Sequence, residues 1–300
     1  MAVLDDAMLQ WIVAAVPGTT VSAVRGLRDG GSPWLVSLTG PTALDVVLRL
    51  GSAAERSGLA TEVAALEHAA AHGVPAPRLI AEDLTGEVSP GLLAVLTTRI
   101  AGASRVTAEP TRARLRAMGA AVAAIHEVPL PSSPALPLRD RPINDVDFGA
   151  LRRAEPAQPL LEEAERVLAQ LPAPPPQVVF VHGDFWHGNT LWEDDTLTGL
   201  VDWDRAGVGP PGVDLGSLRC DAALCAGPDA ADEALAGYEA ATGRPAQDVA
   251  YWDLVAGLST PPTMGWFVGA IQGQGRVDLD QPTLLARRDA FVSDAIDRLS

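Results

Sequence analysis

The segment HGDFWHGN, residues 182–189, places two histidines, an aspartate and an asparagine directly after the apolar run VVFV at 178–181. The apolar segment TLTGLVD, 196–202, follows and ends in a second aspartate, Asp202. This segment can pair with NTLW, 189–192, across the turn EDD, because two apolar runs separated by a short polar turn are typical of a hairpin. The sequence therefore predicts a buried strand, a polar loop and a hairpin in this order, with Asp184, Asn189 and Asp202 at fixed positions along them.

These three polar residues have the composition that phosphoryl transfer requires. The reaction needs a carboxylate to orient and deprotonate the attacking hydroxyl, and oxygen ligands to hold Mg²⁺ on the nucleotide phosphates. In the kinase template a catalytic-loop Asp is followed after four intervening residues by an Asn, and later by a metal-binding Asp. Asp184, Asn189 and Asp202 occur in that order. The pattern predicts a phosphotransferase site.

Two other interpretations of the loop remain open. His182, Asp184 and His187 could be ligands in a metal-dependent phosphohydrolase, but a two-metal site needs further histidines and carboxylates from several strand ends. The other histidines are His68, His72 and His126. Of these, His68 and His72 are four residues apart on a predicted helix, where a solvated surface pair is favoured over a zinc site. A plain hydrogen-bonded turn would explain the loop residues but not the position of Asp202.

The first hundred residues predict strands with one helix. Alternating or continuous apolar runs predict strands at 21–27, 33–39, 45–51, 77–83 and 91–100. The first two flank RDGGS, whose Gly30 and Gly31 permit a hairpin turn. Apolar residues at helical spacing, including Leu59, Val63 and Leu66, predict a helix over 53–72. We expect a small antiparallel sheet with one helix.

After residue 100 the pattern becomes mainly helical. Thr111 is a candidate cap for a helix that ends near His126, and a second helix is expected over 159–171. From about residue 214 the chain is predicted to be helical with Gly and Pro interruptions. We therefore divide the chain into an N-terminal lobe, 1–100, and a C-terminal lobe, 101–300, joined near 98–102.

Composition excludes several classes of protein. The formal net charge of −16 would repel phosphate backbones, so no nucleic-acid partner is expected. The N-terminus, MAVLDDAMLQW, carries acids where a secretory signal needs a basic region, and no run approaches a membrane span of roughly 18 apolar residues. We expect a soluble, cytoplasmic protein with no membrane partner. The two cysteines, Cys220 and Cys225, lack the spacing partners of a zinc site and are expected to be free thiols.

The segments HGDFWHGNTLW and GLVDWDRAGVGPPGVDLGSLR together resemble the signature of the aminoglycoside phosphotransferase family, whose members are small-molecule kinases related in fold to protein kinases. The resemblance extends upstream through DVVLRLG, ATEVAALEHAAAHGVPAPRLI and RAMGAAVAAIHEV. It implies an α+β, protein-kinase-like fold with two lobes. The N-terminal antiparallel sheet with one helix would bind the nucleotide, and the larger, mainly helical lobe would bind the substrate and carry the catalytic residues.

The resemblance also implies roles for individual residues. Asp184 would be the catalytic base, and Asn189 and Asp202 would be the Mg²⁺ ligands. Three supporting roles follow: His182 would brace the loop, Asp204 would add a polar contact near the metal, and Asp214 would steady the loop. A plain helix N-cap is the alternative for Asp214.

The nucleotide-binding residues depart from the template. All 22 basic residues are arginine, so Arg49 stands where the template has a lysine that grips the α and β phosphates. Its expected partner is Glu62, with Glu55 as the alternative. Gly30 and Gly31 of the hairpin would cover the phosphates with backbone amides. The adenine is expected near 97–101, at Thr98 and Ile100.

A further departure is His187, at a position where the family often has proline, and we interpret it as a surface histidine. The predicted function is Mg²⁺-dependent transfer of the γ-phosphate of ATP or GTP to a hydroxyl of a small molecule. An aminoglycoside or other antibiotic is the candidate acceptor. Trp252, Trp266 and Phe267 would line an apolar acceptor pocket or form helix core. A nucleotide-binding protein without transfer activity, or a metal-dependent phosphohydrolase, is the alternative, and a monomer and a homodimer are both compatible with the sequence.

Overall fold

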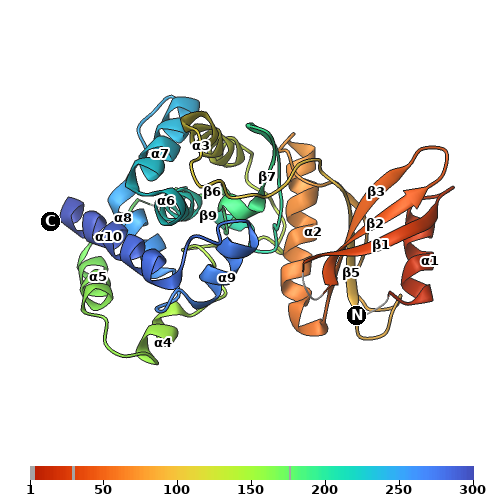
Figure 1. The fold of residues 1–300 in the computed structure, drawn as a ribbon, viewed down its shortest axis with the longest axis horizontal. Helices are drawn as coiled ribbons and strands as arrows, with labels where there is room; N and C mark the ends of the chain where they lie inside the picture. Colours follow the sequence, from red (N-terminus) through yellow and green to blue (C-terminus); the bar gives the residue numbers. More distant parts are fainter. Residues whose placement is uncertain (1–3, 29–30, 176) are drawn as a thin grey trace. The chain divides into compact units, whose positions relative to one another are not determined.

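A computed structural model describes residues 4–28, 31–175 and 177–300. The chain forms two compact units, Met1–Ala101 and Gly102–Ser300 (Figure 1). No helix in the described ranges is long and apolar enough to cross a membrane.

The first unit is built on one antiparallel sheet, in which the predicted strands are confirmed. Its strands are β1 (Thr20–Arg28), β2 (Gly31–Thr39), β3 (Leu44–Gly51), β4 (Leu79–Asp83) and β5 (Leu93–Thr98), in the order β1-β2-β3-β5-β4. Strand β5, whose sequence is nearly all apolar, lies between β3 and β4 and is almost entirely buried. On β3, Arg49 is opposite Val95 of β5.

Among the described residues of this unit, two α-helices accompany the sheet, although only one was predicted. The predicted helix is η1 (Ala53–Glu55) followed by α2 (Arg56–Ala71). The additional helix is α1 (Asp6–Ala15), capped by Asp5, whose side chain accepts a hydrogen bond from the Met8 N–H at 2.8 Å. Met8 and Ile12 of α1 pack in one buried cluster with residues of β2, β3 and β5. The helix was missed because its one buried face is short.

The turn after β4 depends on Asp83, and it gives a prediction for stability. The buried carboxylate accepts hydrogen bonds from the Thr85 hydroxyl and from the N–H groups of Thr85, Gly86 and Val88, at 2.7–2.9 Å. Burial acts to raise the pKa of Asp83, but the hydrogen bonds outweigh it and lower the pKa from 3.8 to about 2. The ionised form is therefore stabilised in the folded state.

We expect Asp83→Asn to lower the free energy of unfolding by about 2 kcal/mol at pH 7, since each pKa unit corresponds to about 1.4 kcal/mol. Because the folded pKa is depressed, this contribution is present above about pH 4 and is lost as the pH falls toward 2. Urea titrations at pH 7 and pH 3 should show the difference from the wild type shrinking at the lower pH. The exposed Glu87 of the same turn provides the control, Glu87→Gln. Equal losses of unfolding free energy in Asp83→Asn and Glu87→Gln would contradict the stabilising role of the Asp83 carboxylate.

The second unit is mainly helical, as predicted. Its helices are α3 (Arg112–His126), α4 (Phe148–Arg153), α5 (Pro159–Gln170), η2 (His187–Asn189), α6 (Gly212–Ala226), α7 (Pro228–Thr242), α8 (Val249–Leu258), α9 (Gly265–Gly273) and α10 (Gln281–Leu299). The predicted cap of α3 is confirmed, because the Thr111 side chain accepts a hydrogen bond from the Arg114 N–H. Two short antiparallel pairs complete the unit: β6 (Val179–Val181) with β9 (Gly207–Gly209), and β7 (Thr190–Glu193) with β8 (Thr196–Leu200).

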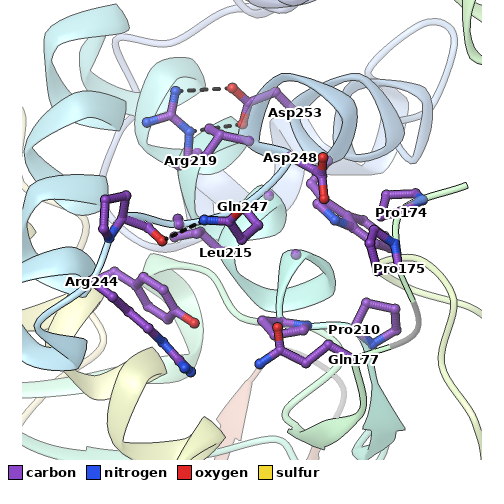
Figure 2. Close-up of a pocket in the computed structure, with 18 residues that line it drawn as sticks. Pro174, Pro175, Gln177, Pro210, Leu215, Arg219, Arg244, Gln247, Asp248 and Asp253 are labelled. Atoms are coloured by element: carbon purple, nitrogen blue, oxygen red, sulfur yellow. Dashed lines mark hydrogen bonds and ion pairs between the residues drawn. The ribbon is translucent and has the colours of Figure 1, made fainter. Parts of the chain in front are cut away.

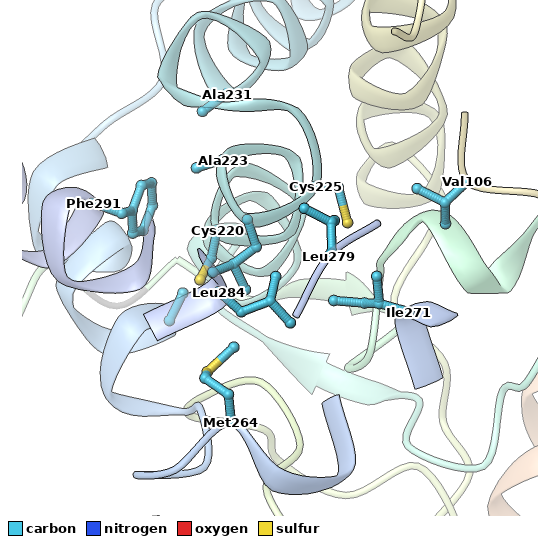
Figure 3. Close-up of a cluster of buried hydrophobic side chains, with 12 residues drawn as sticks. Val106, Cys220, Ala223, Cys225, Ala231, Met264, Ile271, Leu279, Leu284 and Phe291 are labelled. Atoms are coloured by element: carbon cyan, nitrogen blue, oxygen red, sulfur yellow. The ribbon is translucent and has the colours of Figure 1, made fainter. Parts of the chain in front are cut away.

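Helix α6 is the central element of the second unit. It is buried along nearly its whole length and contacts α3, α7, α8, α10 and η2 (Figure 1). Its apolar residues, among them Cys220 and Cys225, pack with residues of α9 and α10 in one cluster (Figure 3). Both cysteines are free, as predicted. Because α6 is fixed from several sides, its side chains can hold neighbouring loops in place.

Candidate active site

The polar loop begins with a turn that only glycine can make. Gly183 follows strand β6 with a φ of +81°, and a Cβ at this position would lie 2.0 Å from the Arg205 carbonyl oxygen. A side chain is therefore excluded twice, by conformation and by space. The geometry of this turn sets where the chain continues into Asp184.

Asp214 of α6 anchors the first end of the loop. Its fully buried carboxylate accepts hydrogen bonds from the His182 and Gly183 N–H groups, each at 2.8 Å, and lies 3.3 Å from His126 Nε2. The N-cap interpretation of Asp214 is wrong, because Pro211 is the N-cap and Asp214 lies within the helix. The carboxylate instead compensates two backbone donors that would otherwise be buried without partners.

Asp221, two helical turns further along α6, anchors the other end of the loop. Its Oδ2 accepts a hydrogen bond from the His187 N–H at 3.0 Å and also contacts His187 Nδ1. Asp214 and Asp221 are seven residues apart and so lie on the same face of the helix. The segment that contains Asp184 is thus held at both ends by carboxylates of one helix.

The interpretation of His187 as a surface residue is wrong. The side chain is 2% exposed and lies in η2 against Asp221. Asp221 was not predicted from the sequence, because its contact with His187 joins two segments that are distant along the chain. One feature of the sequence could have indicated Asp221: it lies seven residues after Asp214 and so on the same face of the helix.

His182 braces the loop through its ring. Nε2 lies 3.0 Å from the Val201 carbonyl oxygen, and the ring packs against Trp203 and Phe185. Burial lowers the pKa of His182, although the charge of Asp214 acts in the opposite direction. The imidazole is therefore neutral at pH 7, with Nε2–H donating to the carbonyl oxygen.

The predicted hairpin places Asn189 and Asp202 beside the loop. Strands β7 and β8 pair directly, with Thr190 opposite Leu200, and the Val201 N–H donates to the Asn189 carbonyl oxygen at 2.9 Å. The Asn189 side-chain amide donates to the Asp184 carbonyl oxygen at 2.9 Å. Asp202 follows β8 with a φ of +66°, an uncommon conformation for a residue other than glycine. Such residues often occur at functional sites.

Three carboxylates surround the guanidinium of Arg205, and two of these residues, Arg205 and Asp145, were not predicted from the sequence. Arg205 binds Asp145 through Nε and Nη2 at 2.7 and 3.1 Å, and its Nη1 lies 3.5 Å from Asp184 and 3.6 Å from Asp204. Burial raises the pKa of Asp184 to about 7, as do the charges of Asp202, Asp204 and Asp145, while Arg205 acts against this rise. The DWDR sequence already placed an arginine beside two of these acids. The sequence around Asp145 gave no indication that this residue contacts Arg205.

In the first unit, Arg49 and Glu62 form the expected ion pair. Arg49 Nη1 lies 3.1 Å from Glu62 Oε2, joining β3 to α2. Glu62 is nearly buried, whereas Arg49 keeps a larger exposed fraction. The alternative partner, Glu55, instead accepts from Ser52 at the start of η1. The guanidinium is thus held by a carboxylate at its predicted position.

The remaining residues predicted to contact the nucleotide are placed as follows. Gly31 begins β2 opposite Arg28, and Gly30 lies outside the described residues. Thr98 ends β5, where its N–H donates to the Arg78 carbonyl oxygen and its hydroxyl accepts from the Arg78 N–H, both at 2.9 Å. Ile100 lies beyond the strand and is half-buried.

A separate groove of about 320 Å³ lies elsewhere in the second unit (Figure 2). Its lining includes Tyr238 and Trp252, several prolines, and the buried ion pair of Arg219 with Asp253. Asp184, Asn189 and Asp202 are not among the described residues that line it. Trp252 is both buried and part of this groove, whereas Trp266 is half-exposed on α9 and stacks on Phe148. The tryptophans therefore do not form one pocket.

Comparisons with known proteins identify the family of this chain. The model of a family described as a phosphotransferase enzyme family matches residues 23–256. A segment of 62 residues is 44% identical to viomycin phosphotransferase from Streptomyces vinaceus. The match spans 19% of this chain and only 22% of that protein.

Solved structures show the same fold over most of the chain. A macrolide 2'-phosphotransferase from Brachybacterium faecium is similar with a TM-score of 0.64 and 20% identity, covering 94% of this chain and 98% of that protein. An amicoumacin kinase, solved in complex with AMP-PNP, Ca²⁺ and Ami, has a TM-score of 0.64 and 15% identity over 97% of this chain and 94% of that protein. At these identities the likeness concerns the fold, and the expected kinase-like α+β fold is confirmed.

Proposed function

This chain belongs to the phosphotransferase enzyme family, and we propose that it transfers the γ-phosphoryl group of ATP or GTP to a hydroxyl group of a small molecule. One observation carries the proposal: a single loop, anchored by two carboxylates of α6, brings Asp184 and Asn189 together beside the hairpin that ends in Asp202. These are the side chains that the kinase reaction requires, in the required order.

Asp184 would act as the base. As the acceptor hydroxyl attacks the γ-phosphorus, its proton passes to the Asp184 carboxylate, the new O–P bond forms, and the bond to the leaving nucleoside diphosphate breaks. A carboxyl with a pKa raised to about 7 can both receive and release a proton near neutral pH. Arg205, 3.5 Å away, offsets the surrounding negative charge and orients the carboxylate.

The residues fit a divalent cation such as Mg²⁺, and we propose Asn189 and Asp202 as its ligands. Carboxylate and amide oxygens are suitable ligands for a hard cation. Because the Asn189 amide nitrogen donates to the Asp184 carbonyl oxygen, the amide oxygen is turned away from that contact. When bound, the ion neutralises charge on the nucleotide phosphates. Asp204 would add a polar contact, and His182 and Asp214 keep the loop in place.

In the N-terminal unit, we propose that Arg49 binds the phosphates while Glu62 holds its guanidinium. Gly30 and Gly31 would contribute backbone contacts, and the base would bind near Thr98 and Ile100. A guanidinium–phosphate bond is charge-assisted on both sides and is worth about 1.5–3 kcal/mol. Loss of Arg49 should therefore weaken nucleotide binding by roughly 10- to 100-fold.

We expect Arg49→Ala to raise the Kd for the nucleotide by that factor without lowering the melting temperature strongly. Titration calorimetry with the non-hydrolysable analogue AMP-PNP measures this directly. Arg25→Ala removes an equal charge from an exposed position on β1 and provides the control. Unchanged affinity in Arg49→Ala, or equal losses in both variants, would contradict the phosphate-binding role.

For the acceptor, we propose an antibiotic or a related hydroxyl compound. The support comes from the similar proteins, which are named for viomycin, macrolide and amicoumacin phosphorylation. We further propose that the reaction takes place in the cytoplasm, where nucleoside triphosphates are available, and that the working unit is a monomer or a homodimer.

A screen for ADP or GDP formation, with Mg²⁺ and either nucleotide, tests the function. Amino-sugar antibiotics, macrolides, cyclic peptide antibiotics and simple alcohols should be offered separately. We expect nucleoside diphosphate to form only with an acceptor that contains a hydroxyl, and the acceptor to gain one phosphate by mass spectrometry. If ADP or GDP forms equally well without any acceptor, and inorganic phosphate is released, the phosphohydrolase alternative is favoured.

A further inference from the structure

The second anchor of the loop contains an unusual group of side chains. His187 of η2 and Asp221 and Cys225 of α6 each offer one possible metal-ligating atom, and these atoms lie within 4.8 Å of one another. In the part of the chain that the structure describes, no other His, Cys, Asp or Glu set of three has this arrangement. The three residues are 2%, 8% and 0% exposed.

The geometry points to a binding site for a thiophilic divalent cation, and we propose that His187, Asp221 and Cys225 bind Zn²⁺ or Cd²⁺. Zinc prefers imidazole nitrogen, thiolate sulfur and carboxylate oxygen at about 2.0–2.3 Å. Ligand atoms around one such ion are therefore roughly 3–4 Å apart. The present separations, all within 4.8 Å, can reach this range through small side-chain movements.

The carboxylate of Asp221 is oriented to serve both neighbours. Oδ2 faces the N–H group and Nδ1 of His187, whereas Oδ1 lies 3.5 Å from Cys225 Sγ. A cation bound between them can use both oxygens, so that one nitrogen, one sulfur and two oxygens supply four ligand atoms. With both oxygens of Asp221 bound, these three residues supply four ligand atoms by themselves.

Charge balance makes this site suitable for a buried position. One thiolate and one carboxylate neutralise a divalent cation, and the neutral imidazole adds no charge. An isolated ion in this position would be strongly unfavourable, because Cys225 packs among Val106, Ile271 and other apolar side chains (Figure 3). On binding, the S–H bond of Cys225 is replaced by a sulfur–metal bond and its proton leaves to solvent, while the imidazole of His187 binds through its unprotonated nitrogen and keeps its proton on the other nitrogen.

The bound cation would fix the end of the loop that contains Asp184 and Asn189. Helix α6 would then hold this loop through Asp214 at one end and through a metal centre at the other. The site is distinct from the one proposed for the nucleotide metal, which uses oxygen ligands only. The two sites can therefore be distinguished experimentally, because only the His187, Asp221 and Cys225 site has a sulfur ligand.

Cadmium titration of the full-length protein tests the proposal, because a cadmium–thiolate bond gives a charge-transfer absorbance in the ultraviolet that oxygen ligands do not give. We expect this band to grow to one equivalent of Cd²⁺ in the wild type, together with a rise in melting temperature. Cys225→Ser should lose the band. Cys220→Ser is the matched control, since Cys220 is the other buried cysteine of α6, and it should keep the band.

His187→Gln and Cys225→Ala give a second check on the ligands. His187→Gln should keep the band but bind Cd²⁺ at least about 10-fold more weakly, as expected when one ligand is lost. Cys225→Ala should lack the band and the metal-dependent rise in melting temperature. A folded wild-type protein that shows no band, or a band that persists in either Cys225 variant, would overturn the proposal.

Discussion

The Asp184→Asn variant should lose about 10³-fold in kcat, because general base catalysis by a positioned carboxylate contributes roughly 10²–10⁴-fold. Asparagine has nearly the same shape but cannot take the proton of the acceptor hydroxyl. Steady-state kinetics with the acceptor identified by screening measures the loss. We expect the Kd for the nucleotide to change little, because the nucleotide contacts are assigned to other residues.

Stability separates this effect from misfolding. The substitution removes one negative charge from a group that also contains Asp145, Asp202 and Asp204, so the melting temperature should stay the same or rise. Asp195→Asn changes an exposed aspartate of the β7–β8 turn and should leave both kcat and the melting temperature unchanged. A folded Asp184→Asn protein with wild-type kcat would remove Asp184 from the mechanism.

The second large effect is expected for Asp214→Ala. This change leaves the buried N–H groups of His182 and Gly183 without their acceptor, at a cost of about 1–3 kcal/mol for each group. We expect the free energy of unfolding to fall by about 3 kcal/mol. Because the loop loses its anchor, kcat should also fall by about 10²-fold, as small displacements of a catalytic group are costly.

The pattern of kinetic change distinguishes positioning from general damage. In Asp214→Ala, the KM for the nucleotide should change less than kcat. Asp214→Asn should recover part of both losses, because its one side-chain oxygen can still accept a hydrogen bond from one of the two donors. Asp229→Ala, at an exposed position near the start of α7, is the control for loss of a carboxylate. An Asp214→Ala variant with wild-type kcat would show that the loop does not depend on this anchor.

Local patterns in the sequence were sufficient to predict most of the first unit. The apolar run of β5 indicated a strand inside the sheet, and the helical spacing around Glu62 indicated that it faces Arg49, with which it pairs. Both inferences depend on periodicity, which is set by backbone geometry alone. Helix α1 was missed because its buried face is short and its contacts are with strands further along the chain.

The site was predictable where neighbouring residues act together and not where distant segments meet. Asp184, Asn189 and Asp202 lie on one strand, loop and hairpin, so their spacing was enough to predict that they lie near one another. The contacts of Asp221 with His187 and of Arg205 with Asp145 join separate segments. Likewise, Cys225 has no ligand spacing in the sequence, since its neighbour His187 is brought to it only by the packing of η2 against α6.

In the proposed reaction, the γ-phosphoryl group passes to an acceptor hydroxyl and not to water. Running the reaction in water labelled with ¹⁸O tests it most directly, because the label enters phosphate only if water is the nucleophile. We predict a phosphorylated acceptor that contains no ¹⁸O, formed in equal amount to the nucleoside diphosphate. Inorganic phosphate containing ¹⁸O, without any phosphorylated acceptor, would contradict the account.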